Sequence, residues 1–251
     1  MWYPDPLPND KETTLIVAGD IWIGTRFIEF QGTSWISKIA AQFEHVVIVF
    51  GNHCYWGMTM STAAEKCRKM LADHIIPNVH ILDCNTVELN DVVIAGCTLW
   101  TDMNKRDPLT MYNMSRYMTY DGKISYKTGP NGYFERFTSE RWVSEHSKHK
   151  AFIEKTASAN KDKKIIVVTH HAPLLTLLHP DHQRDISDGY YASDLSDLIL
   201  DNPNIVLWCC GHTHHQRDTM MVNTRIINNC LGYLSQHFEQ LGLVKHEAIE
   251  I

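Results

Sequence analysis

The sequence has neither a long apolar run nor an excess of basic charge, and these absences exclude several classes of protein. No apolar stretch in the 251 residues approaches the ~18 residues of a membrane span, which excludes an integral membrane protein. The N-terminal segment, with prolines at positions 4, 6 and 8, does not resemble a secretory signal. The 23 Lys and Arg against 29 Asp and Glu give a net charge of −6, which argues against a dedicated nucleic-acid binder. We therefore expect a soluble protein of the cytoplasm.

The cysteines also lack the pattern of a disulfide framework. There are seven, an odd number, and no two of them form a Cys-x-x-Cys pair. This arrangement is typical of reduced intracellular thiols rather than of a secreted scaffold or a structural zinc site.

Five short apolar runs rich in β-branched residues indicate strands that are buried on both faces. They are Thr14–Ala18, Val46–Phe50, Val92–Ala95, Ile165–Val168 and Ile205–Trp208. Helical spacing of apolar residues lies between them, at Ser34–Phe43, Ser61–Leu71, Ser139–Ala157 and Ser193–Leu200, the last with Ser193 as its N-cap. Two apolar runs that flank Asn223-Thr224 indicate a hairpin near the end of the chain. Strands that alternate with helices predict an α/β fold.

The chain has no internal repeat, low-complexity tract or Gly/Ser-rich linker, so we expect a single domain over residues 1–251. Two parts of it do not follow the α/β pattern. Residues 1–12 are broken by prolines and predict an irregular N-terminal segment. Residues 101–137 are polar, aromatic and punctuated by Gly and Pro, which predicts an insert or cap loop with a functional role.

Polar residues follow four of the five predicted strands directly. Gly19-Asp20, Gly51-Asn52-His53, His170-His171 and Gly211-His212-Thr213-His214 stand in these positions. Each of them alone is ordinary turn chemistry, but ligands of open α/β sheets bind beyond the carboxyl ends of the strands. Four such coincidences predict one shared site. We expect an extended chain at the last motif, which would put His212 and His214 on the same side.

The donor types indicate which ions this site would hold. Carboxylate, amide oxygen and imidazole without thiolate suit Mn²⁺, Fe or Zn²⁺. Two divalent cations ~3.5–4 Å apart clamp a phosphate and generate hydroxide near neutral pH. The constellation therefore predicts phosphoester hydrolysis by a metal-activated hydroxide.

These motifs resemble those of the calcineurin-like metallophosphoesterases, in particular a bacterial and phage-like subgroup. Gly19-Asp20, Gly51-Asn52-His53, His170 and Gly211-His212-Thr213-His214 match the family's motifs in order and in strand context. The resemblance implies a four-layer α-β-β-α sandwich of mixed sheets with the metal site at the carboxyl ends of the strands.

The resemblance also implies a role for each motif residue. Asp20 would bridge two metals, Asn52, His170 and His212 would complete one metal site, and His214 would bind the other metal. His53 would stabilise the phosphoryl group or protonate the leaving oxygen. We choose His170 over its neighbour His171 because His170 comes first after the strand.

Two departures from the family pattern affect the expected activity. The family's Asp-x-His motif is absent, since no His precedes His45, so the first metal would keep only Asp20 and His214. We hypothesise that Met1 is an internal or misassigned start and that a strand ending in Asp-x-His is lost upstream. A chain that truly starts at Met1 is expected to hold one metal tightly and to hydrolyse weakly or not at all. Cys54 stands where the family has an acidic residue, and an indirect structural role is a better interpretation than a thiolate ligand.

The sequence leaves the substrate and the final function class open. A small phosphorylated compound is expected, and monoesters, diesters and nucleotides all remain candidates. Aromatic residues and Lys105, Arg106, Arg116 and Lys123 in the 101–137 insert suit a bound nucleotide, although such a loop also packs on its own domain. The alternatives are a degenerate, non-catalytic phosphate-binding or nucleotide-binding relative and, less compatible with the negative charge, a nuclease.

Overall fold

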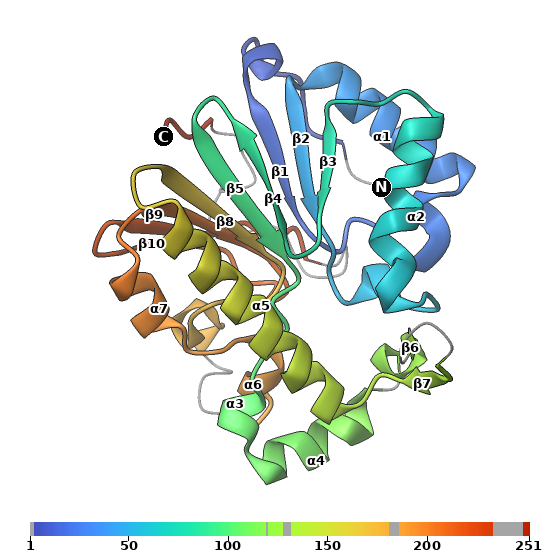
Figure 1. Ribbon diagram of the computed structural model, residues 1–251, viewed down its shortest axis with the longest axis vertical. Helices are drawn as coiled ribbons and strands as arrows, with labels where there is room; N and C mark the ends of the chain where they lie inside the picture. The colour runs from blue at the N-terminus through green and yellow to red at the C-terminus, as the bar shows by residue number, and fades with distance from the viewer. Residues whose placement is uncertain (1–2, 119, 128–131, 181–185, 233–247) are drawn as a thin grey trace.

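The computed structural model describes residues 3–118, 120–127, 132–180, 186–232 and 248–251, and its strands form two main sheets (Figure 1). The smaller sheet has the order β1-β2-β3 and is parallel throughout its described strands. The larger sheet has the order β10-β11-β9-β8-β5-β4 and is mixed, because β4 and β10 run antiparallel to their neighbours. A separate hairpin, β6-β7, lies within the 101–137 insert.

The strands are β1 (Thr14–Ala18), β2 (His45–Val49), β3 (Val79–Leu82), β4 (Asn85–Leu89), β5 (Val92–Cys97), β6 (Ser125–Lys127), β7 (Phe134–Arg136), β8 (Lys164–Thr169), β9 (Ile205–Cys210), β10 (Arg217–Met221) and β11 (Thr224–Asn228). The helices are α1 (Phe30–Gln42), α2 (Met60–Asp73), α3 (Met103–Arg106), α4 (Pro108–Tyr117), α5 (Ser139–Ala159), α6 (Asp188–Tyr191) and α7 (Ser196–Asp201).

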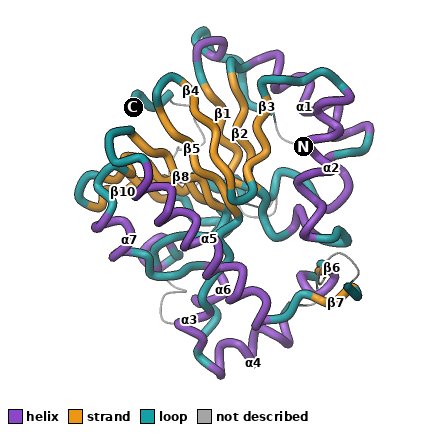
Figure 2. Tube along the Cα trace, in the orientation of Figure 1, coloured by secondary structure: helices purple, strands orange, loops and turns teal. Residues whose placement is uncertain are grey.

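The buried hydrophobic residues divide into three clusters that match the interfaces of a four-layer sandwich. One cluster joins α1 and α2 to the smaller sheet, and a second joins α5 and α7 to the larger sheet. The third lies between the two sheets and includes Val49 and Leu82 on one side and Val168 and Leu207 on the other. Figure 2 shows the strands at the centre with helices outside them. The expected α-β-β-α architecture is confirmed.

The five predicted strands are all present. β1 has the predicted boundaries, and those of the other four differ by one or two residues. β1 is half-buried along its length rather than fully buried, because it is the edge strand of the smaller sheet among the described residues. β3 and β4 were not predicted. β3 is only four residues long, and β4 alternates exposed and half-buried positions, so neither forms a continuous apolar run.

The predicted helices correspond to α1, α2, α5 and α7, but the predicted cap of the last one is wrong. α7 begins at Ser196, whose N–H donates to Asp194 Oδ1 at 3.1 Å. The Ser193 hydroxyl instead accepts from the backbone N–H of Asp102 at 2.9 Å. No helix in the described part of the chain is long and apolar enough to cross a membrane.

The unusual segments have more structure than their composition indicates. Within residues 3–12, which contain no strand, the buried Asp10 accepts hydrogen bonds from Leu7 N–H and from the Gln42 side chain. The 101–137 insert contains α3, α4 and the β6-β7 hairpin rather than only loop. The hairpin near residue 223 is confirmed, with its two-residue turn at Val222-Asn223.

Candidate metal and active site

The predicted site residues follow β1, β2, β8 and β9, so each sheet carries two of the four motifs, and they meet where the carboxyl ends of the sheets converge. Two glycines permit this approach. A Cβ on Gly19, whose φ is +87°, would overlap His170 Nδ1, and a Cβ on Gly51 would overlap the Asp20 carboxylate. Asp20 itself has a φ of 53°, a left-handed conformation that is uncommon outside glycine and often marks a functional position.

Four candidate donor atoms converge on one point. His170 Nε2 lies 3.1 Å from Asp20 Oδ2, 3.2 Å from Asn52 Oδ1 and 3.1 Å from His212 Nδ1. Asp20, His170 and His212 form a cluster whose ligand atoms all lie within 4.8 Å of one another. The structure therefore brings together four of the predicted metal ligands.

Several acceptor atoms of these groups face one another, an arrangement that needs a cation or a proton between them. His170 Nδ1 lies 2.8 Å from the Ala18 carbonyl oxygen, which can only accept, so Nδ1 carries a proton. In the neutral ring Nε2 is then an acceptor, and it faces the oxygens of Asp20 and Asn52, which are also acceptors. The Nε2 atom of His212 is buried without a hydrogen-bond partner among the described residues. Carboxylate, amide oxygen and imidazole in this arrangement fit a divalent cation.

The local electrostatics favour the protonation states that metal ligands need at Asp20 and His212, but not at His170. Burial raises the pKa of Asp20, but the imidazoles of His170 and His53 outweigh it and hold the pKa below its ordinary value. Burial and the neighbouring imidazoles place the pKa of His212 well below its ordinary value, so this ring is neutral. Burial lowers the pKa of His170, but Asp20 outweighs burial and raises it. A proton and a cation therefore compete for the position between them.

Of the two adjacent histidines after β8, His170 has the geometry of a ligand. The His171 Nδ1 atom lies 3.2 Å from the Thr98 carbonyl oxygen, and its ring packs against Trp100 and Trp142. Its centroid lies 4.2 Å from that of His212, so the two rings pack against each other.

His53 lies beside the cluster rather than in it. Its Nε2 is 3.8 Å from Asp20 Oδ2, and its backbone N–H donates to Asp20 Oδ1 at 3.0 Å. The ring stacks on Trp56 with a centroid separation of 3.7 Å, and Trp56 stacks in turn on Tyr120 at 5.0 Å. These contacts hold the imidazole next to the donors while part of it stays exposed.

The chain around His214 differs from the extended conformation that we expected. His212 and His214 have φ values of 67° and 51°, and the Thr213 N–H donates to the Gly211 carbonyl oxygen at 2.8 Å. The chain is therefore bent at each histidine, and the argument that both lie on one side is wrong. Among the described residues, His214 is not part of the close donor cluster.

Asp121, in the 101–137 insert, is a site residue that the sequence did not reveal. Its carboxylate is 3% exposed and accepts hydrogen bonds from Asn52 Nδ2 at 3.0 Å, from Trp56 Nε1 at 2.8 Å and from the Tyr190 hydroxyl. Because Asn52 donates to Asp121 through Nδ2, its Oδ1 turns toward His170. No motif or spacing signals this contact, which joins residues 69 positions apart.

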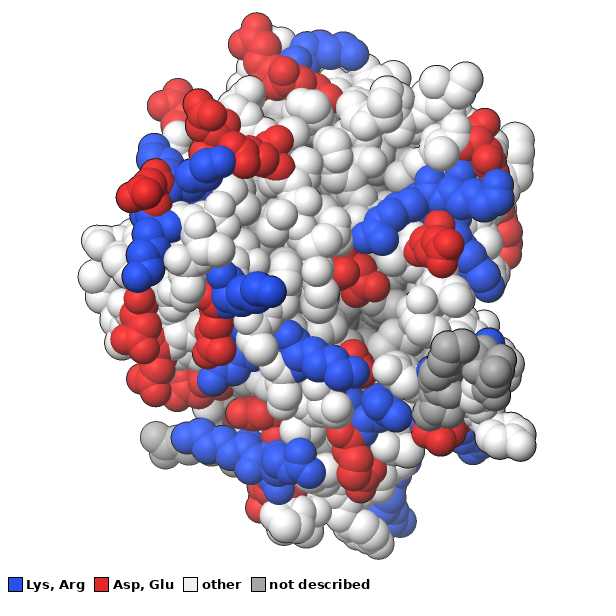
Figure 3. Space-filling view, in the orientation of Figure 1, with Lys and Arg blue, Asp and Glu red and all other residues white. Residues whose placement is uncertain are grey.

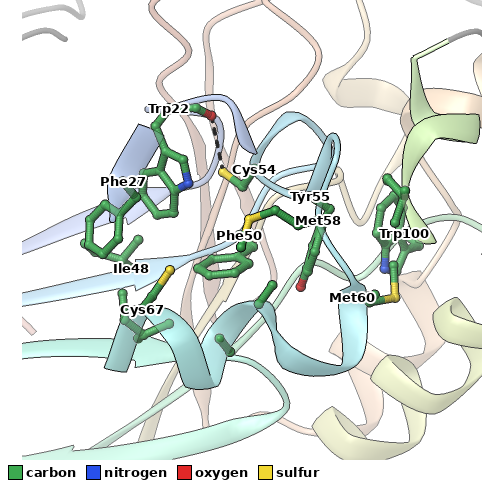
Figure 4. Packing of buried hydrophobic residues seen from close by; sticks show 14 of the residues in the cluster. Trp22, Phe27, Ile48, Phe50, Cys54, Tyr55, Met58, Met60, Cys67 and Trp100 are labelled. Atoms are coloured by element: carbon green, nitrogen blue, oxygen red, sulfur yellow. Dashed lines mark hydrogen bonds between the residues drawn. The ribbon is translucent and has the colours of Figure 1, made fainter. Parts of the chain in front are cut away.

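Cys54 belongs to the hydrophobic core rather than to the donor cluster. It lies among Trp22, Phe50 and Tyr55, and the thiol donates to the Trp22 carbonyl oxygen at 3.6 Å (Figure 4). Its sulfur is 3.9 Å from Asp20 Oδ1, and burial raises the thiol pKa well above its ordinary value. A protonated thiol that faces the core is consistent with an indirect structural role.

The four-layer fold and the donors at its strand ends define the architecture of the metallophosphoesterases. Residues 2–216 match the calcineurin-like phosphoesterase family, and the chain belongs to that family of phosphoester hydrolases.

Known proteins resemble the chain over most of its length. A protein of Acanthamoeba polyphaga mimivirus is 24% identical over 241 residues, which cover 90% of this chain and 80% of the viral protein. The crystal structure of phosphopantetheinyl hydrolase from Mycobacterium tuberculosis matches with a TM-score of 0.61 and 16% identity, covering 88% of this chain and 79% of the mycobacterial one. A dimetal phosphatase from Danio rerio gives a TM-score of 0.46 at 9% identity over 86% and 71% of the two chains. At these identities the likeness to the solved structures concerns the fold.

Proposed function

We propose that this protein hydrolyses a small phosphoester in a reaction that depends on divalent metal. The observation that carries the proposal is the convergence of Asp20 Oδ2, Asn52 Oδ1 and His212 Nδ1 within 3.2 Å of His170 Nε2. These four residues would hold a cation of the Mn²⁺, Fe or Zn²⁺ kind, and His214 is the candidate ligand of a second one beside Asp20. When bound, such cations supply Lewis-acid chemistry that polarises a phosphoryl oxygen and lowers the pKa of water.

The residues around the donors would provide orientation and proton transfer. Asp121 holds the Asn52 amide so that its oxygen faces the cluster. His53 would hold a proton at Nε2 for the leaving oxygen of the ester, since its ring lies next to Asp20 and is partly exposed. Stacking on Trp56 limits the rotation of this ring and keeps the proton near the reacting group.

The substrate class that we favour is a small phosphorylated molecule, with a nucleotide as one candidate, rather than a nucleic acid. On the face in Figure 3, Lys and Arg side chains are interspersed with Asp and Glu, as on an ordinary solvated surface. The net charge of −6 further disfavours the counterion release on which most nucleic-acid binding depends.

A hydrolysis assay with two site variants tests the proposal. Reduced protein is incubated with Mn²⁺ and a chromogenic phosphodiester or phosphomonoester. We expect Asp20→Asn to abolish hydrolysis and His53→Gln to lower kcat about 10²-fold or more, as is typical for removal of a general acid. His74→Gln is the matched control, because His74 is exposed and, within the described part of the chain, its ring bonds only the Met70 carbonyl oxygen. Unchanged hydrolysis in both site variants would refute an enzyme at this site.

The same assay separates the enzyme from a degenerate binding relative. If the wild-type chain binds Mn²⁺ and phosphate but turns over none of the esters, the site is a binding site and the catalytic role of His53 fails. Mn²⁺ binding that is lost in Asp20→Asn would still support the donor assignment.

A further inference from the structure

A second cluster of reactive side chains lies where the chain crosses from the smaller sheet to the larger one. Cys84 occupies this crossing, between the end of β3 and the start of β4, and has a left-handed φ of 53°. Its N–H donates to the Gly96 carbonyl oxygen at 2.9 Å, next to Cys97, the last residue of β5. Continued by one residue, the antiparallel pairing of Asn85 with Gly96 sets Cys84 opposite Cys97. Cys84 is half-buried and Cys97 fully buried, so solvent reaches the pair only from the Cys84 side.

His149 on α5 completes the cluster in a fixed tautomer. The backbone N–H of Leu99 donates to His149 Nδ1 at 2.9 Å, so Nδ1 is an acceptor and the ring proton is on Nε2. A His149 nitrogen lies within 4.8 Å of the Cys84 sulfur, and because Nδ1 already accepts from Leu99, Nε2–H is the group that can donate to a thiolate there. The hydrogen bonds from Cys97 and His149 lower the pKa of Cys84 to about 6, although burial opposes the shift.

Asp83 approaches the same atoms, which raises two other interpretations. Its carboxylate, the Cys84 sulfur and a His149 nitrogen all lie within 4.8 Å of one another, as in some metal sites. A cation needs a bare nitrogen, but Nδ1 already accepts from Leu99 and Nε2 carries the proton. A nucleophilic Cys-His-Asp triad needs the carboxylate on the second ring nitrogen, and Leu99 occupies that position. The geometry fits a hydrogen-bonded thiolate better than either.

We propose that Cys84 and Cys97 form an oxidation site in which Cys84 reacts with a hydroperoxide and Cys97 resolves the product. The Cys84 thiolate attacks the terminal peroxide oxygen, an S–O bond forms and the O–O bond breaks. The leaving alkoxide, or hydroxide from hydrogen peroxide, takes up a proton from the buffer. The Cys97 thiol then attacks the sulfur of the Cys84 sulfenic acid. An S–S bond forms, the S–O bond breaks, and the oxygen leaves with the Cys97 proton as water. The two sulfurs lose two electrons in total and the peroxide gains them.

Peroxide treatment of the full chain tests the site directly. Reduced protein is exposed to hydrogen peroxide, free thiols are alkylated, and the chain is digested and mapped by mass spectrometry without reduction. We expect a Cys84–Cys97 disulfide, and in Cys97→Ser a sulfenic acid at Cys84 that dimedone traps. Cys67 is the internal control, because burial raises its pKa to about 12. The proposal is overturned if Cys84 stays alkylatable after treatment, or if Cys67 is oxidised as fast.

A pH profile separates the thiolate from a merely accessible thiol. A thiolate becomes a weaker nucleophile as the pKa of its thiol falls. The alkylation rate at one pH therefore does not report the pKa of Cys84, whereas the midpoint of the pH profile does. The pKa of about 6 predicts that alkylation of Cys84 rises with pH through a midpoint near that value. Because His149→Gln removes one of the two hydrogen-bond donors, we expect its midpoint to move up by about one unit. The groups that face the cluster, and that the profile also senses, are Asp83, Tyr55, Arg68, Glu145 and His146.

A zinc titration supplies the opposing outcome. The titration uses Asp20→Asn, in which the first site is blocked. We expect Zn²⁺ to show no stoichiometric binding that depends on Cys84, so adding Cys84→Ser should leave the titration unchanged. Tight binding that requires both Cys84 and His149 would make this cluster a metal site and would overturn the oxidation site. If Cys97→Ser fails to fold, the wild-type disulfide map decides, because a Cys84 that stays alkylatable after peroxide treatment overturns the proposal.

Discussion

The buried carboxylate of Asp121 permits a quantitative test of how the donor set is oriented. Asp121→Ala removes the acceptor of the Asn52, Trp56 and Tyr190 side chains and leaves three donors unpaired in a largely buried region. Each unpaired donor costs about 1–3 kcal/mol, so we expect the free energy of unfolding to fall by roughly 3–9 kcal/mol. The Asn52 amide also becomes free to rotate its oxygen away from His170. Loss of such outer partners typically weakens metal binding about 10–100-fold.

Two measurements separate these effects. Urea unfolding in the presence of a chelator gives the stability loss, and calorimetric titration of the folded protein with Mn²⁺ gives the affinity. Tyr190→Phe is the matched control, because it removes only the donor to Asp121 Oδ2 and leaves the bonds at Oδ1. We expect its Mn²⁺ affinity to stay close to that of the wild type. Asp121→Asn serves if the alanine variant does not fold. If Asp121→Ala folds, is destabilised and binds Mn²⁺ as the wild type does, the positioning role is refuted.

The remaining predictions concern the tight turn at the site, the layer between the sheets and the dependence on metal. Gly51→Ala places a methyl group against the Asp20 carboxylate, so we expect Mn²⁺ affinity and hydrolysis to be lost together. A folded variant whose calorimetric Mn²⁺ affinity equals that of the wild type would contradict this packing. Leu207→Ala in the layer between the sheets is expected to cost about 2–5 kcal/mol, read from a lower urea midpoint at unchanged slope, and an unchanged midpoint would contradict its burial. Dialysis against a chelator should abolish hydrolysis and Mn²⁺ should restore it, whereas activity that survives complete metal removal would contradict a metal-dependent site.

Most of the fold follows from local sequence patterns because the strands in the centre of the sandwich are buried on both faces. β-branched residues such as those of β2 and β8 then form continuous apolar runs that stand out from their surroundings. β4 faces solvent along much of its length, and the same signal is absent there. The error at Ser193 is of another kind, since a serine suited to a helix cap bonds the insert instead.

The candidate site was partly predictable for a related reason. Asp20, Asn52, His170 and His212 each follow a recognisable strand, so topology alone brings them to the ends of the sheets. Asp121 and Trp56 depend on how the insert packs, and no local pattern encodes that contact. For His214 the sequence motif was clear but the backbone conformation was not. The left-handed φ values of His212 and His214 change the direction of the chain there.

Because the donors are divided between the two sheets, the site is complete only when the two sheets are packed together. Residues 14–82 build the smaller sheet and carry Asp20 and Asn52, whereas residues 85–228 build the larger sheet and carry His170 and His212. Neither part of the chain holds more than two of the four donors. The contact between Ala18 and His170 joins residues 152 positions apart, so closing it costs more chain entropy than a local contact does. A cation held by all four residues would stabilise the interface between the two sheets. Its release would report separation of the sheets before either sheet unfolds.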